Sequence, residues 1–201
     1  MHVWSLRRSC AGLIGCLALG VGQPVTAHAQ ICFRGYPGHR CDGFVVLEFT
    51  AGAQLNQDPV YTYESGDQSP VYVSWEAGYL HNLGTRSAIG AALRVAADDD
   101  GHRFASVLRY RQWLGSTWSV DLAPGLLLGG SMNQTMLSFP SATGGIALNW
   151  GDRVAVVVGA DQLRRSEGTR WARYAGFRFG TWLAPLATLG LVAVAGATYN
   201  D

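Results

Sequence analysis

From Gly43 onward, apolar side chains recur at every second position, instead of at the spacing of about 3.6 residues that marks a helix. The stretch 87–97 shows this most clearly: its odd-numbered positions are Ser, Ile, Ala, Leu, Val and Ala, and its even-numbered positions are Ala, Gly and Arg94. Successive side chains of a β-strand point to opposite faces. The pattern therefore predicts strands with one apolar face and one face of small residues interrupted by charge.

The same alternation divides the chain into nine candidate strands. Their ranges are 44–55, 70–81, 85–97, 102–113, 117–129, 142–150, 153–163, 170–180 and 186–199. Most exceed the usual strand length of about 5–6 residues and approach the length of about 9–11 that crosses a bilayer at a tilt. Tight connections alternate with longer polar ones, as they do around an outer-membrane barrel.

Four tryptophans fall at the strand ends that the tight connections join. These are Trp113, Trp118, Trp150 and Trp182. An indole buries its ring and hydrates its N–H at the headgroup level of a membrane, so the four predict an aromatic girdle at one end of a barrel. Candidates for the opposite girdle are Phe104, Phe139 and Trp171.

These features resemble the small eight-stranded outer-membrane β-barrels, of the OmpA-transmembrane-domain and OmpX type. The resemblance implies an all-β fold, an antiparallel up-and-down transmembrane β-barrel of eight strands. Nine candidates conflict with the even strand number of bacterial barrels, so either one is not a wall strand or residues 60–64 add a tenth. Residues 174–179 resemble the glycine-and-aromatic assembly signal of such barrels, but about twenty residues follow them.

The N-terminal part of the chain predicts export. Arg7 and Arg8, an apolar run over 10–22 and the small-x-small triplet 27–29 predict a signal peptide over residues 1–29. A lipoprotein site at Cys16 is the alternative. The remaining domains are then a disulfide-closed segment over 30–42 and the barrel over 43–201.

Two cysteines follow the predicted cleavage site. Cys32 and Cys41 form an even pair in an exported chain, which predicts one disulfide. Metal binding by both cysteines and His39 is the alternative, although it lacks a fourth ligand. We expect no metal and no cofactor.

Charge is scarce and balanced along the chain. All 15 basic residues are arginine, 14 residues are acidic, and the net charge is +1. This balance argues against a nucleic-acid partner. On the strands, most charges share the face opposite to the apolar one. Eight of them are expected to pair inside the barrel as an ion-pair network that plugs the lumen: Glu48, Glu76, Arg94, Arg109, Arg111, Asp121, Asp161 and Arg178.

The sequence holds few residues that could support catalysis or cation binding. No His-x-Ser pair occurs, and His102 and Ser106 lie about 13 Å apart on a strand, so no catalytic residue is expected. The run 98–101 is expected to be a solvated turn, with calcium binding as the alternative.

The sequence therefore predicts a protein of the Gram-negative outer membrane, exported by its signal peptide, with a structural or surface-interaction role. Its expected partners are outer-membrane lipid and lipopolysaccharide, and an external partner at loops 56–69 and 130–141. Two alternatives stay open: an outer-membrane enzyme acting on lipid A acyl chains, and a soluble periplasmic lipocalin-like ligand-binding barrel.

Overall fold

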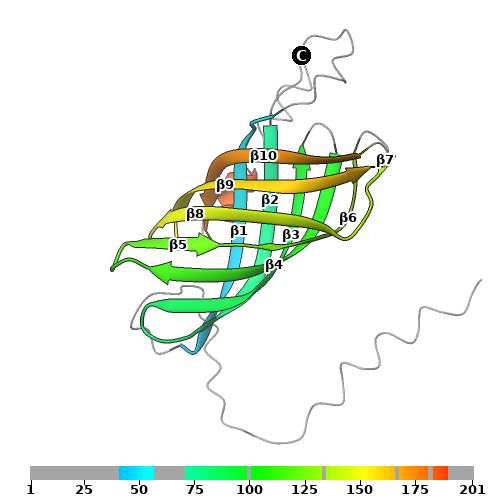
Figure 1. Ribbon diagram of the computed structural model, residues 1–201. Coiled ribbons are helices and arrows are strands. Elements are labelled where there is room, and N and C mark those ends of the chain that lie inside the picture. The colour runs from blue at the N-terminus through cyan, green and yellow to red at the C-terminus, as the bar shows by residue number, and fades with distance from the viewer. Residues whose placement is uncertain are drawn as a thin grey trace, which may run out of the picture. The chain divides into compact units, whose positions relative to one another are not determined.

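The computed structural model describes residues 41–56, 71–98, 101–132, 135–165, 168–180 and 183–189, all within the compact unit Ile31–Asp201 (Figure 1). The strands of this part of the chain are β1 Gly43–Gln54, β2 Val71–Asn82, β3 Ser87–Asp98, β4 Gly101–Trp113, β5 Trp118–Leu122, β6 Gly125–Met132, β7 Thr135–Met136, β8 Ser141–Trp150, β9 Val154–Arg165 and β10 Gly168–Phe179. They belong to a single sheet. The predicted all-β class is confirmed.

The sheet closes on itself as an antiparallel barrel. Each strand from β1 to β4 pairs with the next, β8 pairs with β9 and β9 with β10, and β10 returns to β1 through Phe49↔Phe179 to Gln54↔Tyr174. β5 and β6 share one position in the wall, because both pair with β4 on one side and β8 on the other. The barrel therefore has eight wall positions, as predicted, and the two-residue β7 is an addition to β6.

One predicted strand, 117–129, is broken in two by Pro124. Proline has no N–H for a strand ladder, so regular pairing stops between β5 and β6. The wall is nevertheless continuous there, because the Leu108 N–H donates to the Pro124 carbonyl at 2.8 Å. A register shift between Phe104 and Ala105 adjusts β4 to β6.

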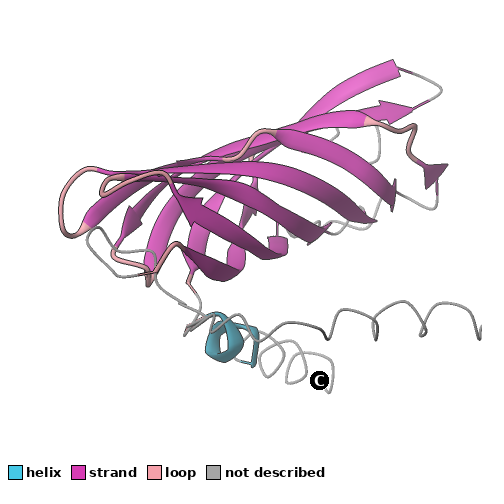
Figure 2. Ribbon diagram, turned by 90° about the horizontal axis from the view of Figure 1, so that it is seen from below, coloured by secondary structure: helices cyan, strands magenta, loops and turns pink. Residues whose placement is uncertain are grey.

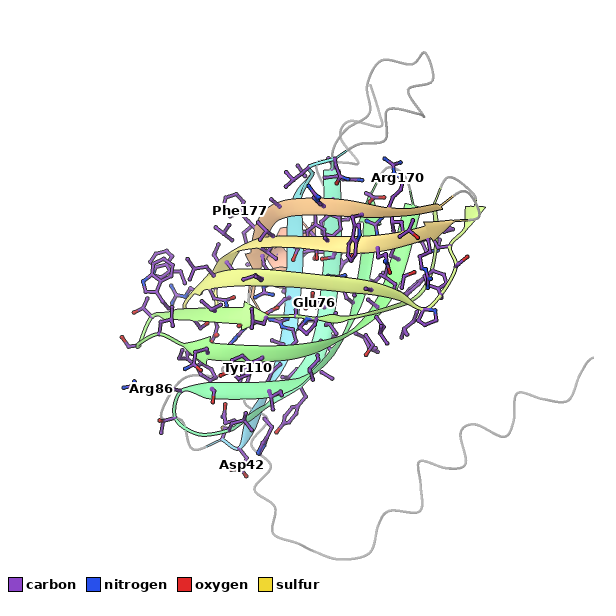
Figure 3. All side chains as sticks on the ribbon, in the orientation of Figure 1. Asp42, Glu76, Arg86, Tyr110, Arg170 and Phe177 are labelled. Atoms are coloured by element: carbon purple, nitrogen blue, oxygen red, sulfur yellow. The ribbon has the colours of Figure 1, made fainter. Side chains whose placement is uncertain are left out.

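The polarity of the two faces of the barrel wall is the reverse of that in a soluble barrel. The outward positions carry exposed apolar side chains, among them Leu93, Leu108, Ile146, Val156 and Phe177. The inward positions carry nine of the buried charged side chains: Glu48, Glu76, Arg94, Arg103, Arg109, Arg111, Asp121, Asp161 and Arg178. In Figure 3, Glu76 lies towards the middle of the barrel, whereas Arg86 and Asp42 mark the end with the short turns. A lipocalin-like cup would turn its apolar face inward.

The described residues after β10 do not begin the predicted strand 186–199. Residues 184–189 form a short helix instead, with Pro185 in its first turn, where proline is tolerated. The helix lies beside the barrel wall, outside the lumen (Figure 2). Residues 190–199 of the predicted strand are outside the described part. No helix among the described residues is long and apolar enough to cross a membrane.

The short helix covers an outward patch where the barrel closes. Phe49 faces outward, yet it is only 1% exposed, and its ring packs against Trp75 and Phe179 at centroid distances of 5.2 and 6.4 Å. The Trp75 indole Nε1 donates to Thr188 Oγ1 at 3.1 Å, which ties the helix to β2. The seam between first and last strands is thus shielded by the segment that follows it.

Candidate functional site

The inward side chains of a single strand, β4, set the order of layers in the lumen. From the short-turn end to the end with the long loops, they are Trp113, Arg111, Arg109, Val107, Ala105 and Arg103, and all are buried. Two charged levels are therefore separated by an apolar one. The side chains that other strands bring to these levels form two distinct charge clusters.

We call the cluster nearer the short turns the turn-side cluster. Its members are Glu48 on β1, Glu76 on β2, Arg109 and Arg111 on β4, Asp121 on β5 and Arg178 on β10. Three guanidinium groups thus meet three carboxylates. All six residues are 6% exposed or less. Removing an ion from water costs several kcal/mol, so charges buried this deeply need close partners.

Asp121 is the centre of the turn-side cluster. Its Oδ1 accepts from Arg111 Nε at 2.7 Å, and its Oδ2 accepts from Arg111 Nη2 at 2.8 Å, a two-point contact that suits the planar guanidinium. The same Oδ2 accepts from Arg178 Nη2 at 2.6 Å and from Arg109 Nη2. One carboxylate therefore holds three strands together across the lumen.

Glu48 and Glu76 complete the pairing. Arg109 Nη1 donates to Glu48 Oε2 at 2.7 Å and to Glu76 Oε2 at 2.6 Å. Arg111 Nη2 reaches Glu48 Oε1 at 3.1 Å. Arg111 Nη1 donates to Asp152 in the turn after β8 at 2.9 Å, so this arginine uses all three nitrogens. The cluster is consequently almost saturated with hydrogen bonds.

The loop-side cluster lies nearer the long loops. It contains Tyr72, Arg94, Asp98, Arg103, Thr143, Asp161 and Tyr174. Arg94 Nη2 donates to Asp161 Oδ1 at 2.7 Å and also to Thr143 Oγ1, while its Nη1 donates to the Tyr174 hydroxyl at 2.7 Å. The Thr143 hydroxyl in turn donates to Asp161 Oδ1 at 2.5 Å.

Arg103 is the second cation of the loop-side cluster. Its Nη2 donates to Asp98 Oδ2, and its Nε lies 3.2 Å from Asp161 Oδ2. Asp98 also accepts from the Gly101 N–H at 3.1 Å, which ties it to the connection between β3 and β4. Asp98 is therefore part of the lumen, whereas the sequence predicted a solvated turn over 98–101; Asp99 and Asp100 lie outside the described residues.

Two stacked tyrosines stand beside these charges. The rings of Tyr72 and Tyr174 are parallel to within 10° at a centroid distance of 4.1 Å. The Arg94 guanidinium lies 5.8 Å from the centre of the Tyr174 ring. Gly159 makes room for this arrangement, because a Cβ there would come within 2.3 Å of the Tyr174 ring. Glycine at this inward position therefore positions an aromatic side chain.

Apolar side chains fill the lumen beyond the charges. Towards the short turns, Phe44, Val46, Leu80, Ala88 and Trp113 form one buried cluster. A second cluster contains Ala92, Ala105, Val107, Leu127, Leu137, Leu163 and Ala172. Leu137 and the half-buried Phe139 enter it from the connection between β7 and β8. The inside of an eight-stranded barrel is just wide enough to be filled in this way.

All eight charged residues proposed from the sequence point into the lumen, in two groups rather than one network. Among the described residues, no ion pair joins Arg94 or Asp161 to the other six. Sequence reasoning missed five partners of these charges: Asp98, Asp152, Thr143, Tyr174 and Asn149, whose Oδ1 accepts from Arg178 Nη2 at 2.8 Å. Asp98 and Arg94 both lie at even-numbered positions of β3, and this shared register could have predicted that Asp98 points into the lumen. Arg153 is exposed in the turn before β9 and belongs to neither group.

The predicted tryptophan girdle needs one correction. Trp118 and Trp150 are 47% and 61% exposed and face each other across the β5–β8 pair at the short-turn end. Trp113 instead points inward, is 6% exposed and packs against Phe44 at 6.1 Å. It shares the odd-numbered register of Arg109 and Arg111, which decides its direction. Trp182 lies outside the described residues.

At the loop end, Phe104 and Trp171 are each 45% exposed on the outer wall, where a second girdle was predicted. Phe139 was predicted there too, but it packs against the lumen cluster instead. Most of loop 56–69 lies outside the described residues.

The predicted disulfide stays a prediction. Cys41 lies just before β1, but Cys32 is outside the described residues, as is His39 of the alternative metal site. No group of three or more metal-ligating side chains occurs among the described residues.

For the alternative that the protein is an enzyme, the structure places the hydroxyl of Ser131 near His102, instead of the hydroxyl of Ser106 considered from the sequence. His102 Nδ1 lies 3.3 Å from Ser131 Oγ, its cross-strand neighbour on β6, on the exposed face of the wall. The His102 ring also makes an edge contact with the ring of Phe104 at a centroid distance of 5.7 Å. No carboxylate among the described residues bonds this imidazole. A serine hydrolase needs such an orienting group and an oxyanion hole as well.

Comparison with known proteins gives two structural likenesses. No protein-family profile and no curated protein sequence matches the chain. The outer membrane protein Ail of Yersinia pestis is similar over 68% of this chain and 99% of its own, with 8% identity and a TM-score of 0.40. A de novo designed transmembrane β-barrel is similar over 74% of this chain and 99% of its own, with 8% identity and a TM-score of 0.36. Both scores are low, so the assignment of this chain to the closed eight-stranded antiparallel barrels rests on its own strand pairing.

Proposed function

We propose that this protein is an outer-membrane β-barrel whose lumen is closed by its own side chains, and that it acts as a structural or surface-interaction protein. The observation that carries the proposal is the reversed polarity of the wall: apolar side chains face out along whole strands and paired charges face in. Water is a poor solvent for such an outer surface, whereas hydrocarbon is a good one.

The exposed tryptophans support the same orientation. Trp118 and Trp150 lie together at the short-turn end of the outer wall, the level at which indoles meet headgroups in membrane barrels. By the usual arrangement of such barrels, the short turns face the periplasm and the longer connections face outward. Lipid and lipopolysaccharide are then the surroundings of the wall, and loops 56–69 and 130–141 are the surface open to an external partner.

Membrane fractionation tests the location. The protein is expected to remain in the membrane pellet after carbonate or urea extraction. It is also expected to migrate differently on gels before and after boiling, because a closed barrel resists detergent unfolding. Recovery in the aqueous fraction without a migration shift would overturn the proposal and favour the soluble barrel.

The closed lumen is tested by conductance. Two charge clusters and two apolar clusters fill the inside, so purified protein in planar bilayers is expected to show no stable channel. A large, reproducible single-channel conductance would contradict the plugged lumen while leaving the membrane location intact. The two experiments therefore fail independently.

The lipid A alternative has its own test. The separation of 3.3 Å between His102 and Ser131 is the one observation in its favour. Deletion of the gene is expected to leave the lipid A mass spectrum unchanged, because no described carboxylate supports this pair. A change in acyl chain number on deletion, restored by the wild-type protein but not by a Ser131→Ala variant, would favour the enzyme instead.

A further inference from the structure

The seam where the barrel closes is shorter than the strand pairs on either side of it. β10 pairs with β1 only over residues 49–54 of β1, whereas β9 and β10 pair with each other over their full lengths. β1 pairs with β2 from Gly43 onward. Residues 43–48 of β1 therefore have a described neighbour strand on one side only.

Two backbone hydrogen bonds show which groups of β1 face the seam. The Asn82 N–H donates to the Asp42 carbonyl at 2.8 Å, and the Leu55 N–H donates to the Arg173 carbonyl at 2.7 Å. The backbone groups of a central antiparallel strand alternate between its two neighbours, so even-numbered residues of β1 bond to β2 and odd-numbered residues bond to β10. The odd-numbered residues of 43–48 consequently direct their N–H and C=O groups to the side where β10 has ended.

The sequence explains why β10 ends there. In the register of the seam, a longer β10 would place Pro185 opposite Gly43, and proline has no N–H to donate. The N–H groups of Leu183 and Ala184 instead donate to the Gly180 carbonyl, at 2.8 and 2.9 Å. A turn and the short helix thus follow β10 in place of a longer strand.

The short helix, residues 184–189, crosses β1 on the outer side of the wall (Figure 2). It follows the end of β10, and its Thr188 Oγ1 accepts from Trp75 Nε1 on β2 at 3.1 Å. The Thr188 hydroxyl also donates to the Ala184 carbonyl at 2.8 Å, which fixes its direction. Ala184 and Phe49 are 4% and 1% exposed. The helix therefore links the strands on both sides of β1, so movement of β10 away from β1 pulls on the contact with Trp75.

Inside the barrel, an ion pair crosses the seam beside the end of β10. Arg178 Nε on β10 lies 3.2 Å from Glu48 Oε2 on β1. Arg178 Nη2 also donates to Asp121 on β5 and to Asn149 on β8, at 2.6 and 2.8 Å. The seam is therefore supported on its inner side by an ion pair and on its outer side by the helix.

We propose that the short helix is a strap that holds this seam closed, and that the wall opens between β1 and β10 when the strap leaves Trp75. Proteins open in local units, and the units with the fewest supporting contacts open at the lowest free energy. The inference goes beyond the proposed function. It gives the barrel one defined place at which the turn-side cluster is reached through the wall.

Hydrogen exchange at single amides tests the proposal on the full chain in lipid nanodiscs. The N–H groups of Ala51 and Ala53 face β10, whereas those of Thr50 and Gly52, in the same stretch of β1, face β2. Separate opening of the seam is expected to make the first pair exchange about tenfold faster than the second, or more. Equal exchange at the four amides would overturn the proposal.

Variants of the strap show whether it controls the opening. Thr188→Val removes the acceptor of Trp75 Nε1, and exchange at the two amides that face β10 is expected to rise about two- to tenfold. Trp75→Phe removes the donor of the same hydrogen bond and is expected to give the same rise. Thr188→Ser keeps the hydroxyl and is expected to match the unmodified chain.

The matched control is Tyr110→Phe, which removes a different hydrogen bond of the outer wall, from Tyr110 Oη to Gln112 Oε1 at 2.7 Å on β4. This bond stays intact when the seam opens, so exchange at the amides that face β10 is expected to be unchanged. Equal acceleration by Tyr110→Phe and Thr188→Val would show that these amides exchange by overall unfolding, and no acceleration by either strap variant would show that the helix does not hold the seam. Both results would overturn the strap.

Discussion

The two charge clusters of the lumen both pair arginines with carboxylates, but their hydrogen bonding differs. In the turn-side cluster, Asp121 alone accepts from three arginines, and hydrogen bonds reach nearly every nitrogen and oxygen. In the loop-side cluster, Asp161 pairs with two arginines, one of its oxygens has no hydrogen bond, and Arg103 keeps two open nitrogens. The turn-side cluster therefore joins more strands through a single carboxylate than the loop-side cluster does.

This difference follows from what each wall position supplies. The turn-side cluster draws carboxylates from three strands, β1, β2 and β5, which surround the arginines of β4. The loop-side cluster has carboxylates only on β3 and β9, and fills the remaining space with tyrosine rings.

The largest expected effect is at Asp121. An Asp121→Asn substitution leaves Arg109, Arg111 and Arg178 without their shared carboxylate, and we expect a loss of about 3–5 kcal/mol in the free energy of unfolding. Urea unfolding in detergent micelles, followed by tryptophan fluorescence, measures this. Asp42→Asn at the exposed start of β1 is the matched control, with an expected change within about 0.5 kcal/mol. Equal effects at the two positions would contradict the claim that the turn-side cluster stabilises the barrel.

A smaller effect is expected in the loop-side cluster. Arg103→Met leaves two carboxylates short of a partner but also removes two open nitrogens, so we expect a loss of about 1–3 kcal/mol. Arg109→Met is the comparison on the same strand; it strips three carboxylates and should cost about 3–5 kcal/mol. If the Arg103 variant proved the less stable of the two in the same unfolding experiment, the contrast between the clusters would be wrong.

The smallest effect is expected outside the lumen. Thr188→Val removes the acceptor of the Trp75 indole and touches neither cluster, so a loss of about 0.5–1.5 kcal/mol is expected. Thr169→Val on the exposed face of β10 is the control and should be neutral. A loss as large as that of Arg109→Met would show that the closing seam, and not the turn-side cluster, limits stability.

The period-two pattern predicted the strands of the barrel and the inward direction of all eight proposed charges, whereas the number of eight wall positions came from the resemblance to small outer-membrane barrels. The pattern could not assign these charges to the two clusters, because that assignment depends on which strands are neighbours in the barrel and on how far each strand is staggered. Arg94 and Asp161 lie 67 positions apart in sequence yet form one ion pair. Pairing of that kind is fixed by barrel closure, which a single sequence does not display.

Three local errors have physical causes of their own. Trp113 was assigned from its place at a strand end, although its register with Arg111 pointed it inward. Asp98 was interpreted as a loop residue because two further aspartates follow it, yet its carboxylate bonds Arg103. The final strand was predicted from alternation over 186–199, but a helical turn after Pro185 places Thr188 against Trp75.

The central claim is that the apolar face meets lipid and the charged face does not. Fluorescence quenching by brominated lipids tests it, because bromine quenches only the indoles that it contacts. Trp118→Phe is expected to remove part of the quenchable fluorescence, since Trp118 is 47% exposed on the outer wall. Trp113→Phe is expected to leave the quenchable part unchanged, since Trp113 packs against Phe44 inside. Quenching that is lost with Trp113 and kept without Trp118 would contradict the account.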